Sequence, residues 1–285
     1  MSRTSGELAH NRRMILAAGV IDATGMAACP GAVLVEGDQI LAAGSPEQIG
    51  SVPSAELVQM PEMLLLPGLV NAHAHLDLSG DGVWPAAGND FRGWVGQVRA
   101  LRAAQTPALC KQAVQRGIEL SLAGGTSCIG DIAGHSPMAT AKALRESSLR
   151  GVSFQEVFGL GDRQNATVDR MRAMAEGGPL EAQGIRLGLS PHAPYSCGPA
   201  VFGAAAECGL PLTTHLAETP AEIELSVSGT GSLRDMLERD IGVWDTSVDV
   251  PHAHPIDALI GSLDRGQFLC AHLNWIEPRH VDMLA

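Results

Sequence analysis

The chain has 285 residues, 45% of them hydrophobic, so it can bury a large core and disorder is not expected. Its formal net charge of -12 argues against nucleic acid as a partner, because phosphates are bound by clustered Lys and Arg. No apolar run reaches the length of a membrane span or of a signal-peptide core, and the six cysteines form no Cys-x-x-Cys pair. We therefore expect a cytoplasmic protein without a membrane partner.

The N-terminal part shows short apolar runs separated by Gly, Pro and Asp, from about residue 14 to residue 66. Such runs predict strands joined by tight turns, and the Gly-Asp-Gln stretch at 37–39 indicates a hairpin. We expect residues 1–63 to form a small β-sheet unit that precedes the main domain.

From about Leu64 the pattern changes to short apolar runs that alternate with helix-length amphipathic segments. The expected strands are 64–76, 126–132, 152–160, 185–196, 211–219 and 268–275. This alternation predicts an α/β fold with a parallel sheet and crossover helices. Six such units are present, whereas a closed (β/α)-barrel needs eight. The pattern leaves two architectures open, an open doubly wound sheet and a barrel cut short.

Four of the expected strands end in a histidine-bearing segment, and the carboxyl ends of barrel strands carry the active site. His73 and His75 are two residues apart on one strand, so both imidazoles can point at one metal ion. His215 on the fifth strand offers a third ligand, and a water in an open position would have its pKa lowered by the metal. Glu218 could move the proton, and His272 could orient the hydroxide.

These segments together resemble the amidohydrolase superfamily, in particular its mononuclear deaminase and chlorohydrolase branch. The resemblance rests on 67–79, 124–132, 189–196, 214–219 and 269–275, which occur in the family's order. It implies a (β/α)8 TIM-like metal-dependent hydrolase barrel over residues 64–285, incomplete here. Residues 1–63 would then be the N-terminal portion of the family's small β-sandwich.

Within that branch, segments 90–102 and 232–245 resemble the aminofutalosine deaminases of menaquinone biosynthesis. Those enzymes convert the 6-amino group of an adenine-like base into a carbonyl and release ammonia. The resemblance implies a small-molecule nucleoside substrate, and it leaves a homodimer open. The implied roles are metal ligation by His73, His75 and His215, catalysis by Glu218 and His272, and substrate contact by His192, Phe91 and Trp94. Phe91 and Trp94 would lie on a loop over the pocket, or else pack on an ordinary helix face.

The scarcity of lysine separates the branches of the superfamily. Binuclear members use a carboxylated lysine on the fourth strand, and residues 185–196 contain no lysine. Lys111 and Lys142 fall in expected helices instead. We therefore expect one divalent ion, Zn²⁺ by default, although a three-histidine site also suits Fe²⁺.

The resemblance also implies a metal-binding aspartate at the end of an eighth strand. The sequence ends at Ala285 after the sixth, and Asp282 lies on the helix expected there, so we expect a C-terminally truncated chain. Such a chain would bind metal weakly and fail to catalyse, and the assigned activity would belong to the intact protein. Two alternatives remain. One is another enzyme of the branch: a chlorohydrolase, a guanine deaminase, or a methylthioadenosine/S-adenosylhomocysteine deaminase. The other is an inactive barrel that acts as a binding module.

Overall fold

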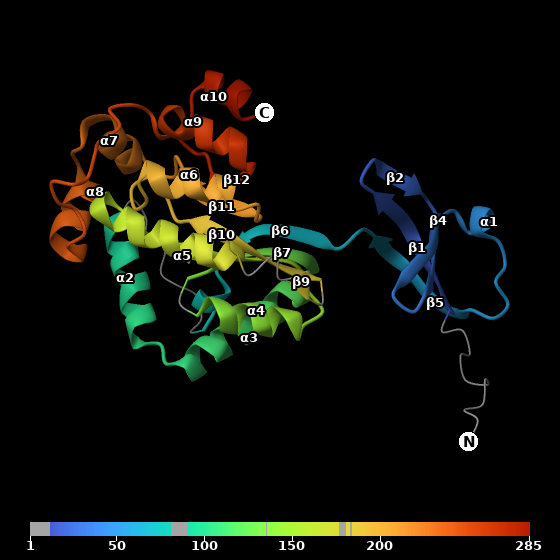
Figure 1. Ribbon diagram of the computed structural model, residues 1–285. Coiled ribbons are helices and arrows are strands. Elements are labelled where there is room, and N and C mark those ends of the chain that lie inside the picture. Colours follow the sequence, from blue (N-terminus) through green and yellow to red (C-terminus); the bar gives the residue numbers. More distant parts are fainter. Residues whose placement is uncertain (1–11, 81–89, 135, 177–180, 183) are drawn as a thin grey trace. The chain divides into compact units, whose positions relative to one another are not determined.

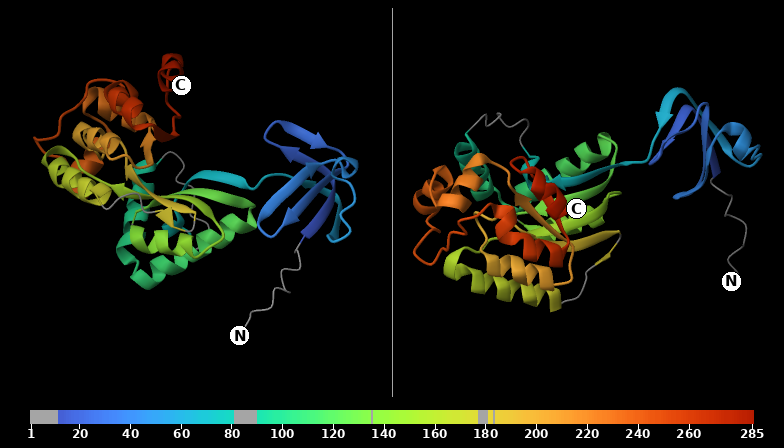
Figure 2. Two further views of the ribbon diagram at one scale, coloured as in Figure 1. Left: turned by 45° about the vertical axis from the view of Figure 1, so that its right-hand side comes forward. Right: turned by 90° about the horizontal axis from the view of Figure 1, so that it is seen from above.

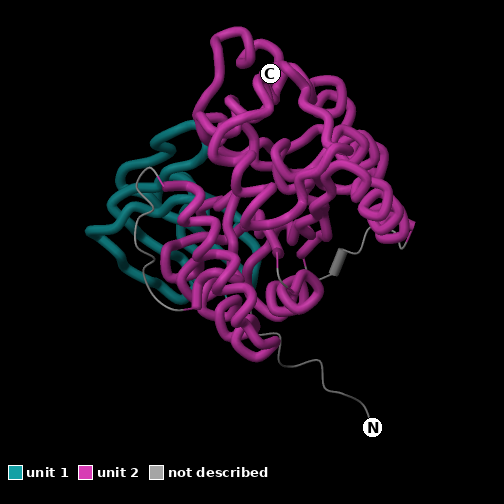
Figure 3. Tube along the Cα trace, turned by 90° about the vertical axis from the view of Figure 1, so that its left-hand side faces the viewer, with its two compact units in different colours: residues 1–68 teal, residues 69–285 magenta. Residues whose placement is uncertain are grey.

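The computed structural model describes residues 12–80, 90–134, 136–176, 181–182 and 184–285, and it contains two compact units (Figure 3). The first unit ends at Gly68 and the second begins at Leu69. The boundary expected from the sequence, between residues 63 and 64, falls inside the last strand of the first unit. None of the described helices is both long and apolar enough to cross a membrane.

The first unit is a β-sheet in the order β2-β1-β3-β4, with β5 added parallel to β1 (Figure 1). Its elements are β1 (Arg12–Asp22), β2 (Gly25–Ala28), β3 (Gly31–Glu36), β4 (Gln39–Gly44), α1 (Pro46–Ile49) and β5 (Glu56–Leu65). The predicted hairpin is confirmed, because β3 and β4 pair antiparallel across Gly37 and Asp38. Gly37 has a φ of 61°, which glycine adopts without steric cost.

The second unit is built on parallel strands in the order β6-β7-β8-β10-β11-β12. Their bounds are β6 (Leu69–Ala74), β7 (Thr126–Ala133), β8 (Arg150–Val157), β10 (Ile185–Pro191), β11 (Leu212–Leu216) and β12 (Phe268–His272), with the short β9 (Glu181–Ala182) antiparallel to β10. Each strand lies beside its predecessor in sequence, so right-handed crossovers place all helices on one side. A doubly wound sheet would reverse its order at a switch point. The order therefore decides for the incomplete (β/α)-barrel, and the predicted fold class is confirmed.

The helices follow the strands as the amphipathic segments predict (Figure 2). They are η1 (Leu76–Leu78), α2 (Phe91–Ala104), α3 (Pro107–Ala123), α4 (Pro137–Arg145), η2 (Gly161–Arg163), α5 (Gln164–Glu176), α6 (Pro199–Glu207), α7 (Pro220–Ser228), α8 (Ser232–Asp235), η3 (Met236–Ile241), α9 (Pro255–Gly266) and α10 (Pro278–Leu284). Many begin with proline in the first turn behind a capping residue, as in Thr106-Pro107 and Thr219-Pro220. Helix α9 was not predicted from the sequence.

The core of the second unit lies between the strands and the outer helices. Phe202 of α6, Leu216 of β11 and Leu144 of α4 are completely buried there. The middle strands are buried along nearly their whole length, as expected for parallel strands covered on both faces. This packing holds the carboxyl ends of the strands, where the histidines lie, in a fixed arrangement.

We predict that Gly151→Ala destabilises the second unit by more than about 1 kcal/mol. Gly151 has a φ of 137°, and a Cβ there would lie 1.9 Å from the carbonyl oxygen of Ile129 on the neighbouring strand. The matched control is Gly96→Ala in α2, where a Cβ meets nothing within 4 Å. That change should stabilise by about 0.8 kcal/mol through helix propensity. Urea unfolding measures both, and equal stabilities would contradict the prediction.

Candidate metal centre and substrate cavity

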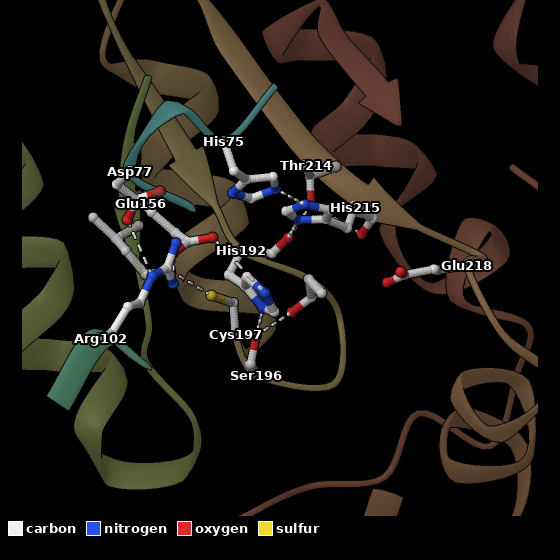
Figure 4. A network of polar contacts seen from close by, with 12 residues as sticks. His75, Asp77, Arg102, Glu156, His192, Ser196, Cys197, Thr214, His215 and Glu218 are labelled. Carbon is white, nitrogen blue, oxygen red and sulfur yellow. Dashed lines mark hydrogen bonds and ion pairs between the residues drawn. The ribbon is translucent and has the colours of Figure 1, made fainter. Parts of the chain in front are cut away.

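Four imidazole rings gather at the carboxyl ends of β6, β11 and β12. The Nε2 atoms of His75 and His215 lie 3.3 Å apart (Figure 4). Ligand nitrogens of His73, His215 and His272 lie within 4.8 Å of one another. The structure thus brings together the three histidines expected as ligands, and it adds His272 to the same group.

The orientation of these rings fits a divalent ion. His215 Nδ1 lies 2.8 Å from the carbonyl oxygen of His192, so it carries the proton and Nε2 keeps its lone pair. Two nitrogens bound to one tetrahedral Zn²⁺ at 2.0–2.1 Å would lie about 3.3 Å apart, as His75 and His215 do. The Nδ1 atoms of His73 and His75 are buried without a hydrogen-bond partner among the described residues. Neutral nitrogen donors of this kind suit Zn²⁺ and similar ions.

Burial keeps these rings uncharged. Desolvation lowers the pKa of His73 to about 4, helped by the nearby His272. Desolvation also lowers the pKa values of His75 and His215 well below the ordinary range. The imidazoles are therefore neutral near pH 7, with one ring nitrogen protonated and the other free to bind metal.

Glu218 lies on the loop after β11 and faces His272, with its Oε1 3.6 Å from His272 Nε2. The loop is held by Glu222, a buried carboxylate that accepts hydrogen bonds from the backbone amides of Ala217 and Glu218, both at 2.9 Å. Burial raises the pKa of Glu218 to about 7. A carboxyl group with that pKa can both accept and return a proton near neutral pH.

His192 comes from the end of β10 and lies against the same group of rings, with its ring centroid 4.9 Å from that of His215. Its Nδ1 lies 2.6 Å from Ser196 Oγ, and Phe158 packs on its ring at 4.8 Å. Ligand atoms of His192, His215 and Glu156 also lie within 4.8 Å of one another. The guanidinium of Arg102 lies 3.1 Å from Glu156 and disfavours a second cation there.

A cavity of about 580 Å³ opens over the histidines. It is lined by His73, His75, His192, His215, Glu218 and His272, together with apolar side chains of α2, η3 and the loops after β8 and β10. The structure places Trp94 in its wall but on helix α2 rather than on a loop, which corrects that part of the expectation. Phe91 lies behind Trp94, with ring centroids 5.8 Å apart, and is not part of the wall.

Four charged residues in and around the cavity, Asp77, Arg102, Asp131 and Glu156, were given no role in the sequence analysis. Arg102 of α2 lies 3.1 Å from both Asp77 and Glu156, whose side chains are almost completely buried (Figure 4). Asp131, at the end of β7, is also fully buried. The available signal was a carboxylate in an otherwise apolar strand segment, but a sequence pattern does not reveal the arginine that reaches it from a distant helix.

Comparisons with known proteins identify the family of the chain. The model of the Amidohydrolase family matches residues 64–283, so the chain belongs to that family. Similar curated proteins include an aminodeoxyfutalosine deaminase of Deinococcus radiodurans, 29% identical over 245 residues, which cover 84% of this chain and 55% of the relative. Another is a 5-methylthioadenosine/S-adenosylhomocysteine deaminase of Symbiobacterium thermophilum, 29% identical over 68% of this chain and 46% of the relative. The chain thus spans about half the length of these relatives.

Solved structures show the same fold. Helicobacter pylori aminofutalosine deaminase in complex with methylthio-coformycin superposes with a TM-score of 0.77 at 21% identity, covering 95% of this chain and 66% of that one. A mutant atrazine chlorohydrolase of Arthrobacter aurescens, complexed with zinc and atraton, gives 0.69 at 18% identity, covering 95% and 63%. Likeness at this level of identity establishes the fold and leaves the substrate open.

We predict that the chain binds close to one equivalent of Zn²⁺ and that His215→Ala reduces its affinity at least tenfold, because one of the converging nitrogens is lost. Metal analysis after dialysis, and competition with a chelator, measure the effect. His252→Ala is the matched control, since His252 is exposed and its ring Nδ1 bonds the backbone carbonyl of Val227. Equal zinc contents in the two variants would refute the assignment.

Proposed function

We propose that the protein is a metal-dependent aminohydrolase that removes the amino group from an adenine-type nucleoside, with aminofutalosine as the first candidate substrate. The observation that carries the proposal is the group of neutral imidazoles at the strand ends beside Glu218. The curated relatives named as deaminases of such nucleosides support the substrate class.

His73, His75 and His215 would hold the ion, and His272 lies close enough to complete or assist the set. A bound divalent ion supplies Lewis acidity and lowers the pKa of water toward neutrality. Glu218 takes a proton from the attacking water and passes it to the substrate, so that the amino group leaves as ammonia. His272 lies 3.6 Å from Glu218, where it orients the carboxylate and the attacking water. Glu218 can both accept and release the proton near neutral pH, because burial raises its pKa to about 7.

The cavity supports a substrate of nucleoside size. Its volume of about 580 Å³ falls within the usual range for small-molecule sites. Apolar side chains such as Trp94, Leu160 and Met236 can cover the faces of a planar ring. His192 borders the metal end of the cavity, where it can hydrogen-bond a ring nitrogen or a substituent next to it.

We predict that Glu218→Gln lowers kcat by about 10²–10⁴-fold, because the amide can no longer accept the proton. Substrate affinity should change much less, since the side chain keeps its size. Glu224→Gln on the exposed side of α7 is the control and should stay within twofold of the wild type. Steady-state kinetics with the best substrate measure both changes. A Glu218→Gln protein with more than a tenth of the wild-type kcat would overturn the role of Glu218.

We further predict chelator-sensitive ammonia release when the full-length, zinc-loaded protein meets a panel of aminofutalosine, methylthioadenosine, S-adenosylhomocysteine, adenosine and guanine. Dialysis against a chelator should abolish the release, and Zn²⁺ should restore it. Chloride release from a chlorotriazine without ammonia from any nucleoside would replace the proposal with a chlorohydrolase. Stoichiometric zinc without turnover of any compound would favour a binding module.

A further inference from the structure

The turn that follows His75 is held by hydrogen bonds to strand β7 and helix α2. This turn, residues 76–77, begins η1 directly after the candidate metal ligand. The amide of Leu76 donates to Asp131 Oδ1 at 3.0 Å, and Asp131 is fully buried at the end of β7. The Asp77 carboxylate accepts from Arg102 Nε at 3.1 Å, and the Asp77 carbonyl accepts from Gln105 Nε2 at 2.7 Å. Amide, carbonyl and side chain of one short turn are thus all engaged.

Two of these three contacts come from a single helix. Arg102 lies in the last turn of α2, and Gln105 is the residue that caps its carboxyl end. The same helix lines the substrate cavity with Trp94, Val98 and Arg102 itself. Helix α2, which forms one wall of the cavity, therefore also holds the turn at residues 76–77, beside the candidate metal ligand His75, through hydrogen bonds.

The hydrogen bonds from Arg102 and Gln105 hold the turn beside His75, whose ring nitrogen Nδ1 has no hydrogen bond of its own to a described residue. A metal-binding histidine is normally oriented by a hydrogen bond to its other ring nitrogen, as His215 is by the carbonyl of His192. His75 Nδ1 is buried and makes no hydrogen bond with any described residue. The direction of the His75 ring must then come from its backbone and from packing, and the bonded turn fixes that backbone.

Arg102 is also the point where three elements meet. Its Nη1 bonds Glu156 of β8 at 3.1 Å, while its Nε bonds Asp77. The side chains of Asp77 and Glu156 are 0% and 1% exposed, and the guanidinium of Arg102 stabilises the negative charge of both carboxylates. A planar fork with several donors suits this double pairing, whereas the single ammonium of lysine does not.

We propose that Arg102, assisted by Gln105, is a positioning residue that couples the α2 wall of the cavity to the geometry of the metal centre through the turn after His75. This proposal rests on the proposed function in one respect only, that His75 is a metal ligand. Removing the link should therefore weaken metal binding and change the ligand field, although Arg102 itself contacts no metal.

The test is metal binding by the full 285-residue chain, with Co²⁺ as a spectroscopic probe and Zn²⁺ in competition with a chelator. Arg102→Met should weaken Zn²⁺ binding about 10–100-fold, which is typical of residues that orient a ligand, and should shift the visible Co²⁺ bands. Arg102→Lys should recover part of the loss. Arg92→Met is the matched control on the same helix, because Arg92 pairs with the exposed Asp240 and should leave affinity within twofold.

Arg102→Met removes the guanidinium that pairs with two buried carboxylates and could prevent folding, which circular dichroism would reveal. Gln105→Met removes only the bond to the Asp77 carbonyl, and it should weaken Zn²⁺ binding several-fold in a folded protein. Wild-type zinc affinity and Co²⁺ spectrum in a folded Arg102→Met protein, or in Gln105→Met where the former does not fold, would overturn the proposal. The titration needs no substrate, so a negative ammonia assay would reject the proposed function and leave this result standing.

Discussion

The crowding of four imidazole rings at one rim is the constraint on which the rest of the site depends. The ring centroids of His73 and His215 lie 4.8 Å apart, and those of His215 and His272 lie 5.4 Å apart. Four charged rings at such distances would repel one another strongly, so the arrangement requires neutral histidines. Burial supplies this condition by disfavouring the protonated form. Each neutral imidazole keeps a lone pair with which it can bind a divalent cation.

Residues around the four histidines also hold the site in place. Glu222 holds the loop that carries Glu218, and the carbonyl of His192 orients His215. These contacts come from the backbone or from buried side chains of adjacent elements, so the geometry is rigid before any ligand arrives. Preorganisation of this kind lets binding and chemistry proceed without reordering the site. The buried carboxylates of this region are stabilised in the same way, since Asp77, Asp131, Glu156 and Glu222 each accept a hydrogen bond from Arg102 or from a backbone amide.

Most strands and helices of the second unit were predicted from the sequence, for identifiable physical reasons. Alternation of short apolar runs with amphipathic segments predicted the strands and helices. Parallel strands are buried on both faces and are therefore apolar throughout, whereas an outer helix is buried on one face only and is therefore amphipathic. The His-x-His pair at 73 and 75 and the histidines at 192, 215 and 272 were recognised by their place at strand ends. The periodicity alone left the barrel and the doubly wound sheet open, because they differ in the order of strands in space; the family resemblance predicted the barrel, and the strand order confirms it. Helix α9 was missed within the long connection between β11 and β12.

What the sequence determined by itself is the set of groups that can do chemistry and the strand ends that bear them, since both follow from residue type and local periodicity. Tertiary structure decided how those groups are oriented and what holds them. That Arg102 of α2 meets Asp77 and Glu156, and that Trp94 lies on a helix in the cavity wall while Phe91 lies behind it, follows from packing between segments distant along the chain. Such contacts leave no period or motif in the sequence, because a buried charge finds its partner through the fold and not through spacing.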